Sequence, residues 1–261
     1  MQDERGGAMP AARCFDENPP QRRPSDELAR APLSLLPRGN WGMIVIVDYR
    51  MGNLRSVQKA LERIGQAAEV SGRPEVVAKA DHLIVPGVGA FPDAMTALRE
   101  RHLVEAIQQV LDAGRPVLGI CLGLQMLLDE SEEVAEAPVD VEALGRRTLP
   151  QGLGLIAGRV VRFSESLAGR GLKVPHMGWN KVVPVGNFPL MAGMPEEGVY
   201  FYFAHSYYAA PRDDSVVATR TDYGGLFTSA VAHENLYATQ FHPEKSQAAG
   251  LAMLRNFVTR T

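Results

Sequence analysis

The chain has 261 residues, of which 46% are hydrophobic and 22% charged, a composition typical of ordinary globular proteins. Its net charge of −3 argues against a nucleic-acid partner or an acidic membrane surface, and no apolar run is long enough for a membrane-spanning helix. The two cysteines, Cys14 and Cys121, are too few for a disulfide framework. This favours a reducing, cytoplasmic location, and the scattered histidines argue against a structural zinc site.

Residues 1–42 are rich in proline, arginine and acidic residues and show no periodicity. Such a segment buries too little apolar area to offset the entropy of ordering it, so we expect a disordered extension. A signal peptide requires a longer apolar core than "APLSLLP" supplies. Met43, which begins the first predicted strand, offers an alternative start. Residues 43–261 are expected to form one domain.

Strand and helix patterns alternate after Met43. "MIVIVD" is a β-branched run typical of a buried parallel strand. Leu54, Val57, Leu61 and Ile64 then recur at helical spacing, and Gly65 stops this helix. A second buried run, "HLIVP", leads into the glycine loop "GVGAF".

One long helix is predicted next, ending at Gly114, and its apolar positions are Met95, Leu98, Leu103, Ile107 and Val110. The strand "RPVLGI" follows, and "LGLQMLLDES" is predicted as the helix after it. The acidic, then proline-bearing segment 131–151 is predicted to be a loop or short helix. Strand–helix alternation of this kind indicates an open, mostly parallel twisted sheet flanked by helices.

The C-terminal half carries a different pattern. Its predicted strands are joined by short turns, which indicates an antiparallel extension of the sheet. These strands are "GLIAGRVVRF", "GVYFYFAHSYY", "SVVATR", "LFTSAVAHE" and "LYATQF". An amphipathic helix over "SQAAGLAMLRNFV" is predicted to close the chain.

Cys121 lies between Gly119 and Gly123, where the strand "RPVLGI" gives way to the following helix. Glycines allow a tight turn that exposes a nucleophile at the carboxyl end of a parallel strand, where open α/β sheets bind ligands. The helix N-terminus behind the thiol favours the thiolate. Free cysteine is also among the most buried residue types, so a structural thiol fits this pentapeptide equally well.

A base for this thiol is available in "ATQFHPEKS", where a predicted strand ends at His242. Pro243 favours extended geometry at His242, so Glu244, two residues on, is expected to reach the imidazole. The three residues then form a Cys–His–Glu triad, in which Glu244 fixes the tautomer of His242. The alternative is a surface turn, because His, Pro and Glu are common in turns.

The glycine loop "PGVGAF" supplies the third element of a site. Its backbone N–H groups, together with that of Leu122, are candidates for an oxyanion hole. A glycine turn after a strand is usually structural. The three elements together, on a fold that brings strand ends to one edge, are much more specific than any one alone.

The chain resembles the class I, triad-type glutamine amidotransferases, which have a flavodoxin-like fold. More narrowly, it resembles the glutaminase subunits of imidazole glycerol phosphate synthase in histidine biosynthesis. The blocks that carry this resemblance stand in the family's order from Met43 to the end: "DYRMGNLRSV", "PGVGAF", "GICLGLQMLL", "PHMGWN", "YFYFAHSYY" and "ATQFHPEKS". "DYRMGN" and "PHMGWN" select this family, whereas the nucleophile and His-Pro-Glu blocks are shared by the superfamily.

The resemblance implies a role for each matching residue. Cys121 would be the nucleophile, His242 the general base and acid, and Glu244 its orienting partner. The oxyanion would be held at Val88, Gly89 and Leu122. The glutamine pocket would be lined by Gln125, Tyr202, Ser206 and Tyr207. A cyclase partner of (β/α)₈ barrel type would face Asn53, Ser56, Lys59, Trp179, Asn180 and Lys245. By sequence alone, Trp179 equally fits a core position, Asn180 a turn and Lys59 a solvated helix surface.

By the same resemblance, the chain hydrolyses glutamine to glutamate and ammonia through a cysteinyl thioester, with no metal or organic cofactor. The ammonia would pass to the cyclase, which makes imidazole glycerol phosphate and an aminoimidazole carboxamide ribotide. Three alternatives stay open. They are the glutaminase subunit of another class I amidotransferase, such as pyridoxal phosphate synthase, a stand-alone cysteine hydrolase, and a catalytically silent binding protein, which the intact triad disfavours.

The chain departs from the family pattern in two places. Arg50 stands where the family commonly has glycine, so we expect a differently shaped loop before the first helix. The segment 131–151 is longer than usual. The extension 1–42 has no family counterpart, and Cys14 within it is expected to be incidental.

Overall fold

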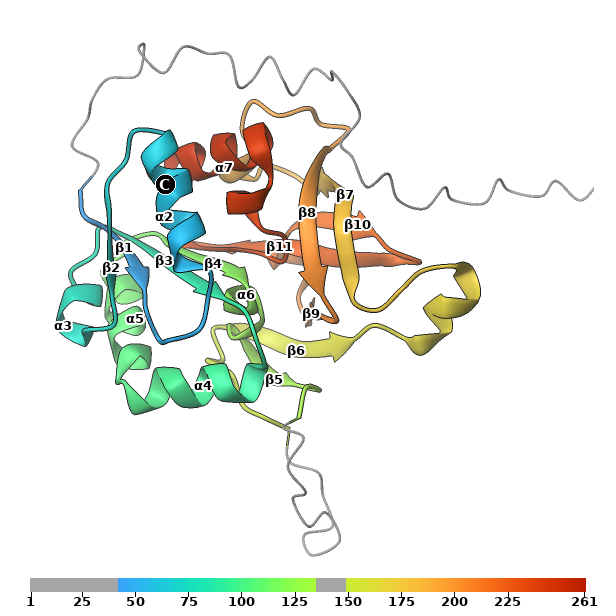
Figure 1. Ribbon diagram of the computed structural model, residues 1–261, viewed down its shortest axis with the longest axis horizontal. Helices are drawn as coiled ribbons and strands as arrows, with labels where there is room; N and C mark the ends of the chain where they lie inside the picture. The colour runs from blue at the N-terminus through green and yellow to red at the C-terminus, as the bar shows by residue number, and fades with distance from the viewer. Residues whose placement is uncertain (1–41, 135–148) are drawn as a thin grey trace, which may run out of the picture.

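The computed structural model describes residues 42–134 and 149–261 (Figure 1). Apart from Gly42, the predicted extension 1–42 lies outside the described residues, as does most of the segment 131–151. Within the described ranges, every helix is too short or too polar to cross a bilayer.

The described residues form a twelve-stranded mixed sheet whose first half is parallel, as the alternating pattern predicts. Each strand of this half pairs with its neighbour in the same direction. In spatial order the strands are β2 (Ala68–Ser71), β1 (Ile44–Val47), β3 (His82–Gly87), β4 (Val117–Cys121) and β12 (Leu236–Thr239).

The second half of the sheet is antiparallel, which confirms the predicted extension. From β12 it continues through β11 (Leu226–His233), β10 (Val217–Asp222), β7 (His176–Pro184) and β8 (Val199–His205). A branch leaves β11 through β9 (Tyr207–Pro211), β6 (Ile156–Arg162) and β5 (Leu128–Ser131). Four 3₁₀ turns are found among the described residues: η2 (Glu165–Arg170), η3 (Pro189–Met191), η4 (Asp214–Val216) and η5 (Pro243–Lys245).

Two hydrophobic cores lie on the two faces of the parallel half. Successive residues of a strand point to opposite faces, so Ile44 and Ile46 of β1 enter one core, and Val45 and Val47 enter the other. The first core is covered by α2 (Leu54–Arg63) and α7 (Gln247–Arg260), and the second by α3 (Pro74–Val77), α4 (Phe91–Glu100) and α5 (Leu103–Asp112) (Figure 1). Strands buried on both faces explain the continuous apolar runs of the sequence.

The long helix predicted to end at Gly114 is instead two helices, α4 and α5. The chain breaks at His102, which takes a left-handed conformation with φ 54°. Leu98 and Leu103, on either side of the break, are both fully buried. The apolar spacing therefore continues across the break, and no glycine or proline marks it.

The helix predicted over "LGLQMLLDES" is also wrong. Only α6 (Leu122–Gln125) is helical, and the chain then enters β5. This strand pairs in parallel with β6, so Leu128 lies beside Ile156. The hydrogen bonds of β5 come from a strand that is distant in sequence, so the local pattern of apolar residues does not indicate a strand here.

Candidate active site

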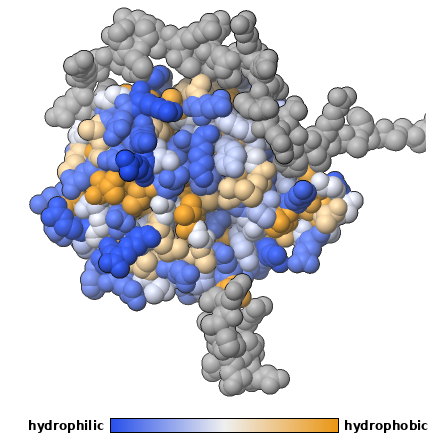
Figure 2. Space-filling model, in the orientation of Figure 1, coloured by the Kyte–Doolittle hydropathy of each residue, from blue (hydrophilic) through white to orange (hydrophobic). Residues whose placement is uncertain are grey.

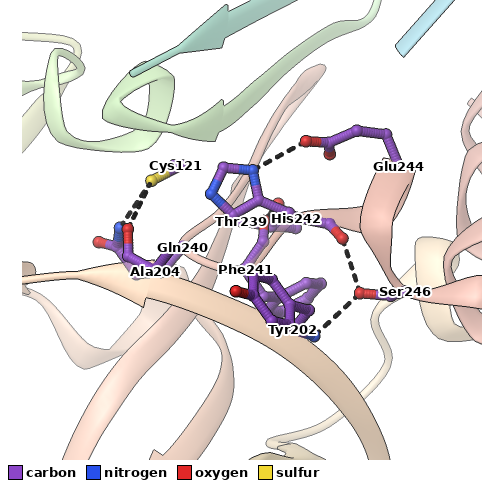
Figure 3. Close-up of polar contacts among 9 residues, drawn as sticks. All are labelled: Cys121, Tyr202, Ala204, Thr239, Gln240, Phe241, His242, Glu244 and Ser246. Atoms are coloured by element: carbon purple, nitrogen blue, oxygen red, sulfur yellow. Dashed lines mark hydrogen bonds and ion pairs between the residues drawn. The ribbon is translucent and has the colours of Figure 1, made fainter. Parts of the chain in front are cut away.

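The carboxyl ends of three neighbouring parallel strands meet at one edge of the sheet. The register places Gly87 at the end of β3 beside Cys121 at the end of β4, and Ile120 beside Thr239 of β12. The glycine loop, the cysteine and the segment leading to His242 therefore converge, as expected for strand ends of an open α/β sheet. Figure 3 shows Cys121 next to the segment from Thr239 to His242.

Cys121 itself carries the backbone strain of this turn. Its φ of 56° and ψ of −106° lie in a region that L-residues rarely adopt, at a cost of about 1–3 kcal/mol. Gly119 and Gly123 serve close packing: a Cβ on Gly123 would lie 2.0 Å from the carbonyl oxygen of Val85, and one on Gly119 would lie 2.8 Å from that of Gly123. The glycines thus let β3, β4 and α6 approach, while the strained residue is the cysteine.

His242 and Glu244 form a buried pair next to this thiol. The Nδ1 of His242 lies 2.8 Å from Oε1 of Glu244, and both side chains are 2% exposed. Glu244 reaches the ring from the 3₁₀ turn η5, not from the extended segment that the sequence predicts. The Ser246 hydroxyl donates to the carbonyl of His242 and accepts from the backbone N–H of Tyr202, which fastens the turn to β8.

The imidazole of His242 lies between Cys121 and Glu244 (Figure 3). Burial by itself lowers the pKa of His242, but the charge of the Cys121 thiolate and hydrogen bonds to Cys121 and Glu244 outweigh it and raise this pKa to about 10. These contacts therefore favour the protonated form of the His242 imidazole. The helix α6 is only one turn long, so the positive charge beside the sulfur comes mainly from His242.

A cavity of about 260 Å³ opens over the sulfur. It brings together six of the residues that the sequence places in the oxyanion hole and glutamine pocket: Val88, Gly89, Leu122, Gln125, Ser206 and Tyr207. Gly89 has a φ of 105°, a conformation that favours glycine over other residues at this position. The cavity also has lining residues that the sequence did not single out: Glu133, Pro175, Met177, Ala204 and His205.

Glu133 is the acidic residue of this lining. Its carboxylate accepts a hydrogen bond of 2.9 Å from the backbone N–H of Phe91, at the start of α4. Burial raises the pKa of Glu133, the bond from Phe91 lowers it, and the nearby Asp93 raises it. In the sequence Glu133 belongs to the acidic run "DESEE", a pattern typical of a solvated loop, so nothing local distinguishes it.

Two buried histidines, His176 of β7 and His205 of β8, are in hydrogen-bond contact, and His205 lines the cavity. The Nδ1 of His176 lies 2.9 Å from Nε2 of His205, whose Nδ1 donates to the carbonyl of Tyr207 at 2.8 Å. Burial first, and then the neighbouring histidine, lowers the pKa of His176 to about 2. Burial also lowers the pKa of His205 to about 3. Both rings are therefore neutral at physiological pH.

Tyr202, predicted in the glutamine pocket, lies elsewhere. It shares a face of β8 with Ala204 but stands one pleat further from the cavity, paired with Trp179 of β7. Its ring is 6.2 Å from that of Trp179, and Nζ of Lys245 lies 5.8 Å from its centroid. Tyr202 thus groups with two of the predicted partner-facing residues.

The other predicted partner-facing residues are placed less uniformly. Asn53, just before α2, and Lys59, on α2, are exposed, and Ser56 between them is half-buried. Asn180 is engaged within its own chain, because its amide donates to the carbonyl of Asp222 at 2.9 Å and lies 3.3 Å from Nε2 of His176.

Arg50 adopts a φ of 69°, in the left-handed region that glycine occupies freely. Arg50 therefore has a backbone conformation that glycine adopts more easily, and the expectation of a loop shaped differently from the family's stays a prediction. The Arg50 N–H donates to the carboxylate of Asp48 at 2.9 Å, which helps to hold the turn.

The surface around the site is not uniformly polar. Hydrophobic side chains show in several places across the middle of the molecule (Figure 2). Among the exposed hydrophobic residues, Met177 is 57% and Val88 40% exposed, and both line the cavity over Cys121.

Comparison with known sequences gives one consistent set of relatives. Residues 45–261 match the family described as glutamine amidotransferase class-I. The chain is 51% identical over 217 residues to the imidazole glycerol phosphate synthase subunit HisH of Syntrophotalea carbinolica, covering 82% of this chain and 98% of the relative. The protein of the same name from Geobacter sulfurreducens is 48% identical, with 82% and 97% coverage, and that from Methanothermobacter thermautotrophicus 49%, with 83% and 98%.

Solved structures share the fold at low sequence identity. A crystal structure described as a glutamine amidotransferase is 20% identical with a TM-score of 0.60, over 83% of this chain and 97% of that one. A chain in the structure of PurLQS from Thermotoga maritima is 17% identical with a TM-score of 0.58, over 84% of this chain and 98% of that one.

Proposed function

Because the chain belongs to the class I glutamine amidotransferase family, we propose that it is the glutaminase subunit of an imidazole glycerol phosphate synthase. One observation carries the chemistry: a strained cysteine at a strand end faces a buried imidazole–carboxylate pair beneath a cavity. Within the family, the choice of this synthase rests on relatives that are about 50% identical to the chain and are all named as subunits of it.

The reaction follows from the groups around the sulfur. The Cys121 thiolate attacks the side-chain amide carbon of glutamine, and backbone N–H groups at Gly89 and Leu122 receive the oxyanion. The His242 imidazolium gives its proton to the departing nitrogen, so that ammonia leaves and a γ-glutamyl thioester remains. Neutral His242 then takes a proton from water, which attacks the thioester and releases glutamate. Glu244 holds the ring in one tautomer throughout.

The cavity suits the rest of the glutamine molecule. Among the described residues that line the cavity, Glu133 supplies the one carboxylate, which fits the α-ammonium group of an amino acid. Ser206 and Tyr207, at the corner between β8 and β9, supply a polar wall on another side. We therefore assign Glu133 to substrate recognition, alongside the residues that the sequence indicates.

The partner is proposed to be a cyclase of (β/α)₈ barrel type, docked over the mouth of this cavity. Met177 and Val88 leave large hydrophobic surface exposed there. Trp179 lies on the same face of β7 as Met177, and it contacts Tyr202 beside Lys245. Asn53, Ser56, Lys59 and Asn180 complete the proposed face. A covered mouth keeps ammonia unprotonated on its way to the second reaction.

The test separates ammonia production from its use. When the cyclase is added, the wild-type chain supports synthesis from glutamine and from ammonium salts. Cys121→Ala is expected to lose only the glutamine-dependent synthesis, and ammonium-dependent synthesis should rise at alkaline pH, where free ammonia increases. A variant that still uses glutamine would exclude Cys121 as the nucleophile. Glutamine hydrolysis that is indifferent to the cyclase would favour a stand-alone hydrolase.

We place the protein in the cytoplasm, because the nucleophile must remain a free thiol. A reducing compartment maintains that state without further protection.

A further inference from the structure

Gln240 is a fully buried amide in contact with the sulfur of Cys121. It follows β12, and its Nε2 lies 3.6 Å from Sγ, within hydrogen-bond distance for sulfur (Figure 3). The sulfur also lies 4.0 Å from the carbonyl oxygen of Ala204, a longer and weaker contact. Burying a carboxamide costs free energy unless its nitrogen and oxygen are hydrogen-bonded. The hydrogen bonds of Gln240 therefore show which of its two atoms faces the sulfur.

A backbone carbonyl fixes that orientation. The carbonyl oxygen of Tyr207 can only accept, so the group of Gln125 that lies 2.8 Å from it must be the amide nitrogen. The second hydrogen of that nitrogen points to Gln240, whose facing atom, at 3.2 Å, must then be its oxygen. The nitrogen of Gln240 is left on the side of Cys121, and an N–H therefore points at the sulfur.

The anchoring carbonyl is held from its other side as well. His205 donates to the same oxygen of Tyr207, and the second nitrogen of His205 is engaged by His176. Two donors thus share the carbonyl oxygen of Tyr207. A flip of Gln125 would set its oxygen against that carbonyl, and a flip of Gln240 would set its N–H groups against those of Gln125. Neither amide is free to turn its oxygen toward Cys121.

We propose that Gln240 is a further catalytic residue, whose carboxamide N–H hydrogen-bonds to the Cys121 sulfur and stabilises it as a thiolate. A thiolate is a strong acceptor for this N–H and a thiol a weak one. When water cleaves the thioester, the C–S bond breaks and its electron pair returns to sulfur. The same N–H then donates a hydrogen bond to the thiolate that forms. This inference rests on the proposed function, which makes Cys121 the nucleophile.

Other groups near the sulfur act on it independently of Gln240. His242, with Glu244 behind it, faces it from the turn after β12. Tyr49, whose buried hydroxyl donates to the carbonyl of Pro86, lies near it from the β1 side, and burial followed by the cysteine's charge raises the pKa of Tyr49. These groups stay unchanged when Gln240 alone is replaced, so a substitution there isolates its N–H.

The experiment measures thiolate formation through the rate of alkylation by iodoacetamide across pH, in the full chain. Cys14 is replaced by serine in every protein, which leaves Cys121 as the single thiol of the sequence. Gln240→Met keeps the length of the side chain without a donor. Gln240→Glu keeps the shape and the acceptor that Gln125 needs, and sets an oxygen against the sulfur. Gln108→Met, at an exposed position on α5, is the matched control.

The pH at which alkylation reaches half of its plateau rate is expected to rise by about one unit in Gln240→Met and further in Gln240→Glu, the size expected for a hydrogen bond to a charged group. The alkaline plateau stays at the wild-type rate, so the whole pH profile moves to higher pH. The control keeps the wild-type profile. In complex with the cyclase, the kcat for glutamine falls with the alkylation rate while KM changes little.

Three outcomes overturn this inference. Superimposable pH profiles would show that the N–H does not act on the thiolate. A rate lowered equally at every pH would indicate altered access to the sulfur. Loss of cooperative thermal unfolding in both Gln240 variants would make the residue structural. If the wild-type chain does not turn over glutamine or Cys121 is not its reactive thiol, the proposed function fails first, and the two failures remain distinguishable.

Discussion

In the parallel half of the sheet, the nucleophile and its base stand at the ends of adjacent strands, β4 and β12. The antiparallel half adds another wall of the cavity with Ala204 and the neutral ring of His205, followed by Ser206 and Tyr207. The contrast is clearest in two buried histidines. Burial lowers the pKa of both rings, but at His242 the negative charge of Cys121 and the hydrogen bonds to Cys121 and Glu244 outweigh it, whereas at His205 no comparable partner does. Local partners, not depth of burial, decide which histidine carries charge.

Loss of the charged pair in the parallel half gives the largest expected effect. Cys121→Ala removes glutamine hydrolysis completely. Glu244→Gln keeps the nucleophile and the imidazole but no longer fixes the tautomer, so we expect kcat to fall about 10²–10⁴-fold. Steady-state glutaminase assays of the two variants with the cyclase decide the question. Equal and complete loss in both, with both folded, would contradict a supporting role for Glu244.

Acid tests the neutral histidines of the antiparallel half. His176 and His205 have folded pKa values of about 2 and 3, well below the ordinary 6.5 of the unfolded chain. Their contribution to stability is therefore complete above pH 6.5 and is lost as pH falls toward 3. Each costs about 1.4 kcal/mol per pH unit below 6.5, so the unfolding free energy should drop by about 2–3 kcal/mol between pH 7.5 and 5.5.

The control for this prediction is the variant with glutamine at both positions. His242 titrates with the opposite sign, because its raised pKa adds stability at low pH that is lost as pH rises toward 10. It is present in both proteins, so the difference between their urea denaturation curves at the two pH values isolates the histidine pair. Equal acid sensitivity in the two proteins would show that the pair does not bind protons on unfolding.

The charge of His242 is predicted to depend on the cysteine across the site. In Cys121→Ala the thiolate charge and its hydrogen bond are gone, while burial, which lowers the pKa, and Glu244, which raises it, remain. We expect the pKa of His242 to fall well below 10. NMR titration of its ring in the variant and in the wild-type chain measures this directly. An unchanged value would assign the protonation to Glu244 alone.

The two halves also differ in what the sequence reveals. Cys121, His242 and the glycine loop follow apolar strands, so the general rule for strand ends brings them together without knowledge of distant contacts. Sequence patterns miss Glu133 and Gln240 because the roles of these residues depend on pairing with Phe91 and Gln125 through the tertiary fold. The strand β5 is mistaken for helix for the same reason, since its hydrogen bonds come from β6. Contacts that are remote in sequence leave no local period.

The smallest expected effect concerns backbone strain. In the parallel half, two non-glycine residues near the site are strained in this way. Both Arg50 and Cys121 have positive φ, but only the cysteine is required for the proposed reaction. In Arg50→Gly the left-handed penalty disappears, whereas the unfolded chain gains conformational freedom, so the net stabilisation should be about 1 kcal/mol or less. Urea denaturation measures it, and glutaminase kcat should remain at the wild-type value. A stability loss of that size would mean that the side chain of Arg50 makes contacts worth more than its strain. A changed kcat would mean that the strained loop, like the strained cysteine, contributes to the site.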